Sequence, residues 1–227
     1  MEFVGIDKFS LLDYDEKVSV VLFSPACNFR CPFCHNGNSV LNSSAAIPFS
    51  EIYEFLKSRK GLIDAVVFTG GEPTLMPELK ERIKAVRELG FLIKLDTNGT
   101  NPEILEDLLK EGLLDYVAMD IKNSEKRYSE TTDCPQLNIE KIKKSIGILR
   151  DFGKNYEFRT TIVKEFHDEL SIKEMGEMIR GAKKLYLQKF VDREGVIRKG
   201  LHEVSLEEAN HFKDILSLFV PTELRGY

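Results

Sequence analysis

Three cysteines that lie close together in the sequence are the first residues whose types and spacing could do chemistry. Cys27, Cys31 and Cys34 are spaced C-x3-C-x2-C, and the one other cysteine, Cys134, lies far along the chain. A secreted disulfide scaffold would distribute pairs of cysteines along a short chain, so the cluster indicates metal ligands in a reducing compartment. Three thiolates in one loop can hold three irons of a [4Fe–4S] cluster, which normally takes four cysteines. The fourth iron would then be open to another ligand.

Two other interpretations of the cysteines stay open. A zinc ion could bind the three thiolates together with His35 or Cys134, although structural zinc sites usually pair cysteines in two knuckles and the sequence has no second knuckle. The thiols could instead be core residues without a ligand. The polar neighbours Asn28 and Arg30 argue against a core position. We expect Cys134, which lies away from every motif, to be structural.

Polar residues end or interrupt several apolar runs further along the chain. Asp96 and Asp120 each end such a run. If the two runs are consecutive parallel strands, the carboxylates meet at one edge of the sheet and repel each other unless a cation or a donor separates them. Lys122 should lie on the same face as Asp120. Arg159 and Gln188 interrupt apolar runs, where burial of a polar group costs free energy unless it is paired.

The spacing of the apolar runs predicts a parallel sheet. Most runs are apolar almost throughout, as in strands buried on both faces, and amphipathic helical patterns with start and stop signals separate them. A closed barrel needs eight such units and about 250 residues. The six units found here predict an α/β fold, a partial, laterally open (β/α)6 barrel, with a doubly wound open sheet as the alternative. The expected strands are residues 18–23, 65–69, 92–96, 116–121, 157–163 and 185–191.

The composition is that of a globular protein. Of 227 residues, 42% are hydrophobic and 30% are charged, and we find no linker or repeat, so we expect one domain over residues 1–227. The net charge of −5 argues against nucleic acid or an anionic membrane as the main partner. No apolar run is long enough to span a membrane and the start does not resemble a secretory signal, so we expect a cytoplasmic protein. Residues 35–49 form a long polar connection, either functional or a surface insertion.

Taken together, the motifs resemble those of the radical S-adenosylmethionine (SAM) enzymes. The cysteine spacing with an aromatic residue before the last cysteine is typical of that superfamily, and Cys34-His35-Asn36 resembles its glycyl-radical-enzyme activating branch. The sequence is most similar to the longer form of the activating protein of anaerobic ribonucleoside-triphosphate reductase. The similarity covers nearly the whole chain, and its further motifs are Thr69-Gly70-Gly71-Glu72-Pro73, Leu95-Asp96-Thr97-Asn98-Gly99, Met119-Asp120-Ile121-Lys122, Phe158-Arg159-Thr160-Thr161 and Leu187-Gln188-Lys189-Phe190.

The resemblance implies a [4Fe–4S] cluster and SAM as cofactors. Cys27, Cys31 and Cys34 would bind three irons, and SAM would chelate the fourth through its amino and carboxylate groups. In related activating enzymes, acids such as Asp96 and Asp120 can hold a monovalent cation beside SAM, which makes such a cation a third candidate. The residues expected to contact SAM or this cation are Phe33, Gly70, Gly71, Glu72, Asp96, Thr97, Asn98, Asp120, Lys122, Arg159 and Gln188.

The resemblance also implies the activity, a radical SAM oxidoreductase that activates a partner protein. It would generate a 5′-deoxyadenosyl radical and abstract hydrogen from a glycine of a glycyl radical enzyme. We expect an anaerobic ribonucleotide reductase as the first candidate partner, a pyruvate formate-lyase type enzyme as the second, and a flavodoxin or ferredoxin-type electron donor. Two alternatives remain: a radical SAM enzyme acting on a small molecule, like 7-carboxy-7-deazaguanine synthase, and a non-catalytic iron–sulfur or zinc module.

Overall fold

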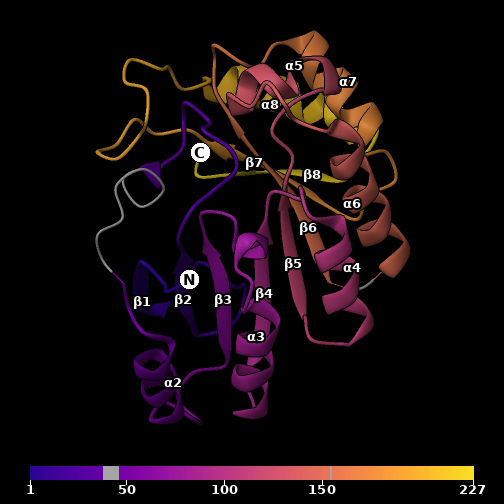
Figure 1. The fold of residues 1–227 in the computed structure, drawn as a ribbon. Coiled ribbons are helices and arrows are strands. Elements are labelled where there is room, and N and C mark those ends of the chain that lie inside the picture. The colour runs from indigo at the N-terminus through magenta and orange to yellow at the C-terminus, as the bar shows by residue number, and fades with distance from the viewer. Residues whose placement is uncertain (38–45, 154) are drawn as a thin grey trace.

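One eight-stranded sheet organises the chain. The computed structural model describes residues 1–37, 46–153 and 155–227. The strands are hydrogen-bonded in the order in which they occur in the sequence, with β1 antiparallel to β2 and every later pair parallel (Figure 1). The strands are β1 (Gly5–Ser10), β2 (Ser19–Ser24), β3 (Ala65–Gly70), β4 (Leu92–Thr97), β5 (Tyr116–Asp120), β6 (Tyr156–Ile162), β7 (Leu185–Lys189) and β8 (Thr222–Arg225).

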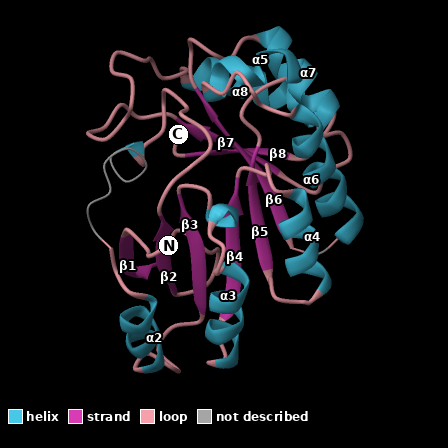
Figure 2. Cartoon of the chain, viewed as in Figure 1, coloured by secondary structure: helices cyan, strands magenta, loops and turns pink. Residues whose placement is uncertain are grey.

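Helices follow the outside of the curved sheet (Figure 2). The crossover from one parallel strand to the next is right-handed in nearly all proteins, and the sheet here always advances in one direction, so successive helices cover the same face. None of those in the described ranges is both long and apolar enough to cross a membrane. They are α2 (Phe49–Lys57), α3 (Leu79–Glu88), α4 (Pro102–Lys110), α5 (Glu125–Thr132), α6 (Ile139–Phe152), α7 (Glu169–Met178) and α8 (Leu206–Ser217), with a 3-10 turn, η1 (Pro73–Leu75).

The strand order confirms the partial, laterally open barrel and rules out the doubly wound sheet. A doubly wound sheet reverses its strand order at a switch point, and this sheet does not. Among the residues that the structure describes, no ladder joins β8 to β1, so the curve does not close. The six predicted strands are β2 to β7. Strands β1 and β8 were not predicted, because most of their residues stay partly or fully exposed and the prediction rests on runs that are apolar almost throughout.

Capping residues in the sequence mark where several helices begin and end. Asn138 accepts a hydrogen bond from the backbone of Glu140 at the start of α6, and Gly153 ends this helix in the left-handed region with φ 64°. Ser205 accepts one from the backbone of Glu208 at the start of α8. These side chains satisfy donors that the first turn of a helix leaves free.

Two apolar cores lie on opposite faces of the sheet. The larger packs the helices onto the sheet and also includes Phe29, Cys31 and Phe33 of the loop after β2. The smaller lies inside the curve and contains Tyr14, Val21, Ala65 and Val67. Tyr14 comes from the turn between β1 and β2, and its ring lies 5.5 Å from that of Tyr116. This turn closes the amino end of the interior, so the space left inside the curve is at the carboxyl end.

Candidate functional site: a cysteine loop over the carboxyl edge of the sheet

The three clustered cysteines lie in the loop that follows β2. The backbone N–H of Phe29 points at the Sγ of Cys27 (3.4 Å), and the N–H of Cys34 donates to the carbonyl of Cys31 (2.9 Å). Arg30 ties the loop to the end of α5 through its N–H and the carbonyl of Thr132 (2.9 Å). All three thiols are free, and Cys31 is buried. The loop is therefore held by its own turns and by a neighbouring helix.

The glycine pair at the end of β3 lets that strand pack against the start of the cysteine loop. A Cβ on Gly71 would lie 1.9 Å from the carbonyl oxygen of Ala26, and a Cβ on Gly70 would lie 2.5 Å from the nitrogen of Ser24. Gly70 also has a φ of +105°, a conformation that other residues rarely adopt. The close approach seen here is thus between two parts of the chain. The expected approach to SAM stays a prediction.

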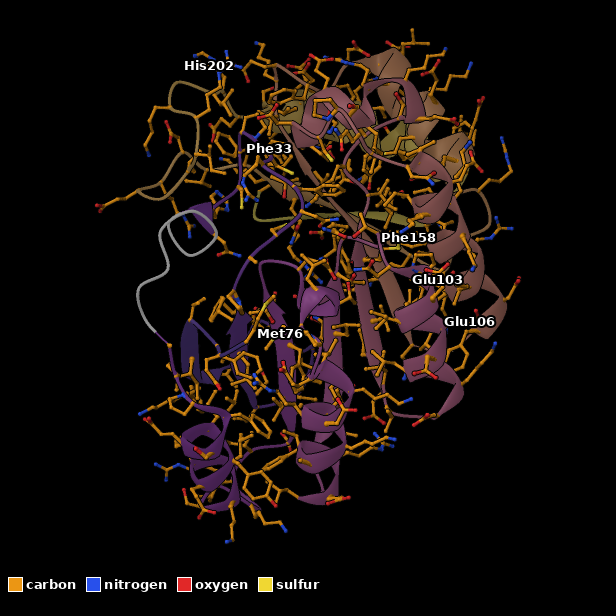
Figure 3. The ribbon with its side chains drawn as sticks, in the orientation of Figure 1. Phe33, Met76, Glu103, Glu106, Phe158 and His202 are labelled. Atoms are coloured by element: carbon orange, nitrogen blue, oxygen red, sulfur yellow. The ribbon has the colours of Figure 1, made fainter. Side chains whose placement is uncertain are left out.

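A cavity of about 360 Å³ lies between the cysteine loop and the strand ends. Its size falls in the range of about 300–1,000 Å³ usual for small-molecule sites. The three cysteines line it, and so does Phe33, which lies in the upper part of the molecule in Figure 3. The other predicted site residues that line it are Gly70, Gly71, Asp96, Thr97, Asn98, Asp120, Lys122, Arg159 and Gln188.

Glu72 does not line the cavity. Its carboxylate is buried and accepts hydrogen bonds from the backbone and hydroxyl of Thr74, the hydroxyl of Thr97 (2.8 Å) and the backbone of Asn98 (2.7 Å). Burial raises the pKa of Glu72, although these hydrogen bonds favour its charged form. Glu72 therefore fixes the turn after β4, and its expected contact with the SAM ammonium stays a prediction.

Arg159 connects the two acids that were expected to converge. Its Nη1 lies 3.1 Å from Asp96 Oδ2, and its Nε lies 3.0 Å from Asp120 Oδ1. Lys122 binds the other oxygen of Asp120 at 2.8 Å, as expected from its place on the same face. Burial raises the pKa of Asp120, but the charges of Lys122 and Arg159 outweigh it and lower the pKa to about 2. The positively charged group that must separate the two carboxylates is therefore the side chain of Arg159.

Asparagines connect the cysteine loop to the neighbouring strand ends. Asn98 Nδ2 lies 3.9 Å from the Sγ of Cys27 and donates to Asn28 Oδ1 (2.8 Å). Asn28 in turn donates to the hydroxyl of Thr100 (2.9 Å). Asn36 donates to the carbonyl of Gly70 (2.9 Å). These amides link the cysteine loop to the ends of β3 and β4, so the loop and the strand ends form one unit.

Two residues at the cavity and its rim, Lys94 and Asp13, were not predicted from the sequence. Lys94 is buried on β4, two residues before Asp96, and its Nζ lies 3.7 Å from Asp96 Oδ1 and also donates to the carbonyl of Asp13. The rule that found Arg159, a charged residue inside an apolar strand, would have found Lys94 as well. Asp13 lines the cavity from the turn between β1 and β2, and no pattern in the sequence points to it.

The cysteines of the loop need a bound cation before they can act as thiolate ligands. Burial raises the pKa of Cys27 to about 11 and that of Cys31 to about 12, so these thiols need a cation to ionise near neutral pH. Within the described ranges, no group of three or more His, Cys, Asp or Glu side chains is placed to hold a metal ion. In a cluster each cysteine binds a different iron, so the thiols need not meet at one point. The His35 ring stacks on Phe190, and its Nε2 contacts the carbonyl of Val191.

The model of the radical SAM superfamily matches residues 21–177. The chain therefore belongs to this superfamily, as the three-cysteine motif and the open parallel sheet had indicated. Membership implies a [4Fe–4S] cluster and SAM. The donor set of the cavity, three thiols beside glycine, carboxylate and amide groups, is compatible with both.

Several proteins with known names are similar to this chain in sequence or in fold. A protein of Methanocaldococcus jannaschii that carries the provisional name of glycyl-radical enzyme activating enzyme is 36% identical over 193 residues, which are 82% of this chain and 78% of that protein. The 7-carboxy-7-deazaguanine synthase of Thermococcus kodakarensis is 26% identical over 183 residues, 71% of this chain and 70% of that one. A radical SAM methyltransferase from Sphaerobacter thermophilus has a similar fold (TM-score 0.73, 16% identity, 93% of this chain, 67% of the other).

Proposed function

We propose that this protein is a radical SAM activase that installs a glycyl radical on a partner enzyme. The observation that carries the proposal is the single cavity in which the cysteine loop meets polar residues from the ends of five consecutive parallel strands, β3 to β7. The 36% identity to a protein provisionally named as such an activating enzyme supports the choice of reaction. The cysteine motif alone would fit any member of the superfamily.

Each group of residues has a task in this proposal. Cys27, Cys31 and Cys34 would hold the cluster through three thiolates. Lys122 and Arg159, fixed by Asp120 and Asp96, offer positive charge on one wall of the cavity for an anionic ligand group. When bound, the cluster and SAM would supply one-electron chemistry, and the protein's part is to orient them and exclude water.

The open side of the barrel suits a partner that presents a peptide loop. No ladder joins β8 to β1 in the described part of the chain, so the curve leaves a lateral gap in its hydrogen bonding. A glycine on a loop is a suitable target because it has no side chain to obstruct approach to its α-carbon. We propose an anaerobic ribonucleotide reductase as the partner, with a pyruvate formate-lyase type enzyme second, and a flavodoxin or ferredoxin-type protein as electron donor.

The decisive experiment uses the reconstituted, reduced protein with SAM and a candidate partner under anaerobic conditions. Electron paramagnetic resonance should show a glycyl radical on the partner, and chromatography should show 5′-deoxyadenosine in a matching amount. A partner in which the target glycine is replaced by alanine is the control and should give no such signal. The proposal fails if SAM is cleaved but no candidate partner acquires a radical, an outcome that would favour the small-molecule alternative.

A further inference from the structure

We propose that the Arg159 guanidinium is the built-in counter-cation of the Asp96–Asp120 pair, so that SAM binding in this protein does not depend on a monovalent metal ion. The inference deepens the proposed function, because it takes SAM as the ligand of the same cavity. Among the described residues, Arg159 is the side chain that bonds both carboxylates, at 3.1 Å to Asp96 and 3.0 Å to Asp120. The place between two acids that an alkali ion could occupy is thus filled by a side chain.

The register of the sheet explains how one arginine reaches two other strands. Asp120 on β5 lies directly opposite Arg159 on β6, whereas Asp96 on β4 lies opposite Ala118. Ala118 and Asp120 share a face of β5, since side chains alternate along a strand. The small side chain of Ala118 leaves room on that face, so the guanidinium can extend across β5 to Asp96. A lysine would reach with a single ammonium group and lacks the planar fork that binds two acceptors.

The remaining bonds of the two acids leave few oxygens for a metal ion. Asp120 Oδ2 binds Lys122 at 2.8 Å, and Asp96 Oδ2 also accepts a hydrogen bond from the hydroxyl of Thr69 at 3.1 Å. Asp96 Oδ1 is buried without a hydrogen-bond partner in the described part of the chain, and its nearest cation is Lys94 at 3.7 Å. A single free oxygen beside a lysine is a poor site for a further cation, because the lysine repels it.

The test measures SAM binding calorimetrically, with sodium and potassium replaced by a bulky organic cation at constant ionic strength. We expect the affinity of the wild-type protein to change less than about twofold, because every exposed charge is screened equally in both solutions. Arg159→Met should weaken SAM binding roughly tenfold or more, since it leaves two buried carboxylates without their shared partner. Potassium should then restore part of the affinity of the variant. Arg159→Lys should lie between the two proteins.

Arg87→Met is the matched control, because it removes an arginine from an ion pair with Asp115 that lies outside the cavity (2.8 Å). It should behave like the wild type in both solutions. Wild-type affinity that falls on removal of alkali ions would overturn the proposal. An Arg159→Met variant that stays insensitive to potassium would do the same.

A second measurement decides the question without SAM, and so separates it from the proposed function. Crystals of the wild-type and Arg159→Met proteins are soaked with rubidium and examined by anomalous diffraction. We expect a peak between the carboxylates of Asp96 and Asp120 only in the variant. A peak there in the wild-type protein, or in neither protein, contradicts the assignment. Absence of SAM binding together with the expected peaks would instead count against the proposed function alone.

Discussion

At the scale of single residues, the clustered cysteines differ from Cys134 in their surroundings. Cys27, Cys31 and Cys34 line the cavity, and burial raises the pKa of the first two. Cys134 follows α5 in a turn closed by hydrogen bonds with Ser129, and it does not line the cavity. The residue type is the same, but only three of the four thiols face a space that could hold iron.

We therefore expect Cys27→Ala, Cys31→Ala and Cys34→Ala each to lose the cluster, because a methyl group cannot replace a thiolate ligand. Iron and sulfide analysis after anaerobic reconstitution, with the visible absorption of the cluster, is the measurement. Cys134→Ala is the matched control and should keep full iron content. Loss of iron in Cys134→Ala, or its retention in any of the other three, would disprove this assignment.

Asp120→Asn should weaken SAM binding by about tenfold while iron content stays at the wild-type level, because the change leaves Lys122 and Arg159 short of a charged partner but touches no cysteine. Calorimetric titration with SAM, beside an iron assay, measures both effects. Asp107→Asn changes an exposed acid paired with Lys80 on the helical surface and serves as the control. Equal SAM affinity in the Asp120 variant and the wild type would show that this acid does not position the binding site.

At the scale of elements, the fit of β3 against the cysteine loop depends on Gly71. Gly71→Ala would place a Cβ 1.9 Å from the Ala26 carbonyl, and backbone atoms cannot yield as a flexible side chain does. We expect a loss of stability at or above the ~1–3 kcal/mol usual for overpacking, together with reduced iron uptake. Urea unfolding and iron analysis measure the two. Gly147→Ala, in α6 with nothing within 4 Å, should instead stabilise by about 0.5–1 kcal/mol.

A buried histidine connects β6 with the segment after β5. His167 Nδ1 accepts from the backbone of Val163 (3.0 Å), which assigns the proton to Nε2, and Nε2 donates to the carbonyl of Lys122 (3.0 Å). Burial lowers the pKa of His167 to about 4, so the folded protein holds the ring neutral. This contact fixes the backbone at Lys122, whose side chain lines the cavity.

The stability that His167 contributes should be complete above pH 6.5 and decline as the pH falls toward 4, because the unfolded chain takes up the proton first. The full contribution of His167 to the free energy of unfolding, lost between these two pH values, is on the order of 3 kcal/mol. His167→Gln should flatten the curve of unfolding free energy against pH in this window. His211→Gln, at an exposed position, is the control and should leave the curve unchanged. Parallel curves for the wild type and His167→Gln would refute this account.

The elements that could be predicted are those whose pattern reflects burial on both faces. Strands β2 to β7 and the caps at Asn138 and Ser205 follow from local sequence. Strands β1 and β8 lie at the edges, where one-sided exposure removes the continuous apolar signal. The cavity residues at the strand ends could be placed together because parallel strands end at one edge, but Glu72 does not line the cavity and no pattern in the sequence points to Asp13. The ion pairs among the cavity residues could not be predicted, since the bond from Arg159 to Asp96 crosses a third strand and depends on side-chain length and register.

At the scale of the whole molecule, the interior holds two charged layers with different tasks. The upper layer is the Asp96–Arg159–Asp120 group at the cavity. The lower layer, nearer the amino end, centres on buried Glu157, which accepts from the Tyr116 hydroxyl (2.9 Å) and pairs with Arg225 of β8 (3.3 Å). Glu157 does not line the cavity, and its contacts join β6 to β5 and to β8.

Arg225→Met should therefore destabilise the protein without changing SAM affinity or iron content. Leaving a buried charge unpaired costs about 3–5 kcal/mol, and the low end applies here because Tyr116 still donates to Glu157. Urea unfolding measures the loss. Lys184→Met, which removes an exposed partner of Glu223 on the same strand, is the control and should cost less than about 1 kcal/mol. A selective loss of SAM affinity in Arg225→Met would mean that the two layers are not separate.

The open sheet has a further consequence for where the molecule opens first. Because each strand pairs only with its neighbours in sequence, β1 and β8 are held from one side in the described part of the chain, and opening can proceed inward from either margin. Strands β4 and β5, in the middle of the sheet, lie furthest from both margins. Asp96 and Asp120 are on these two strands. Local opening at the lateral gap can therefore widen the access to the cavity, while the wall that carries these two acids keeps its shape.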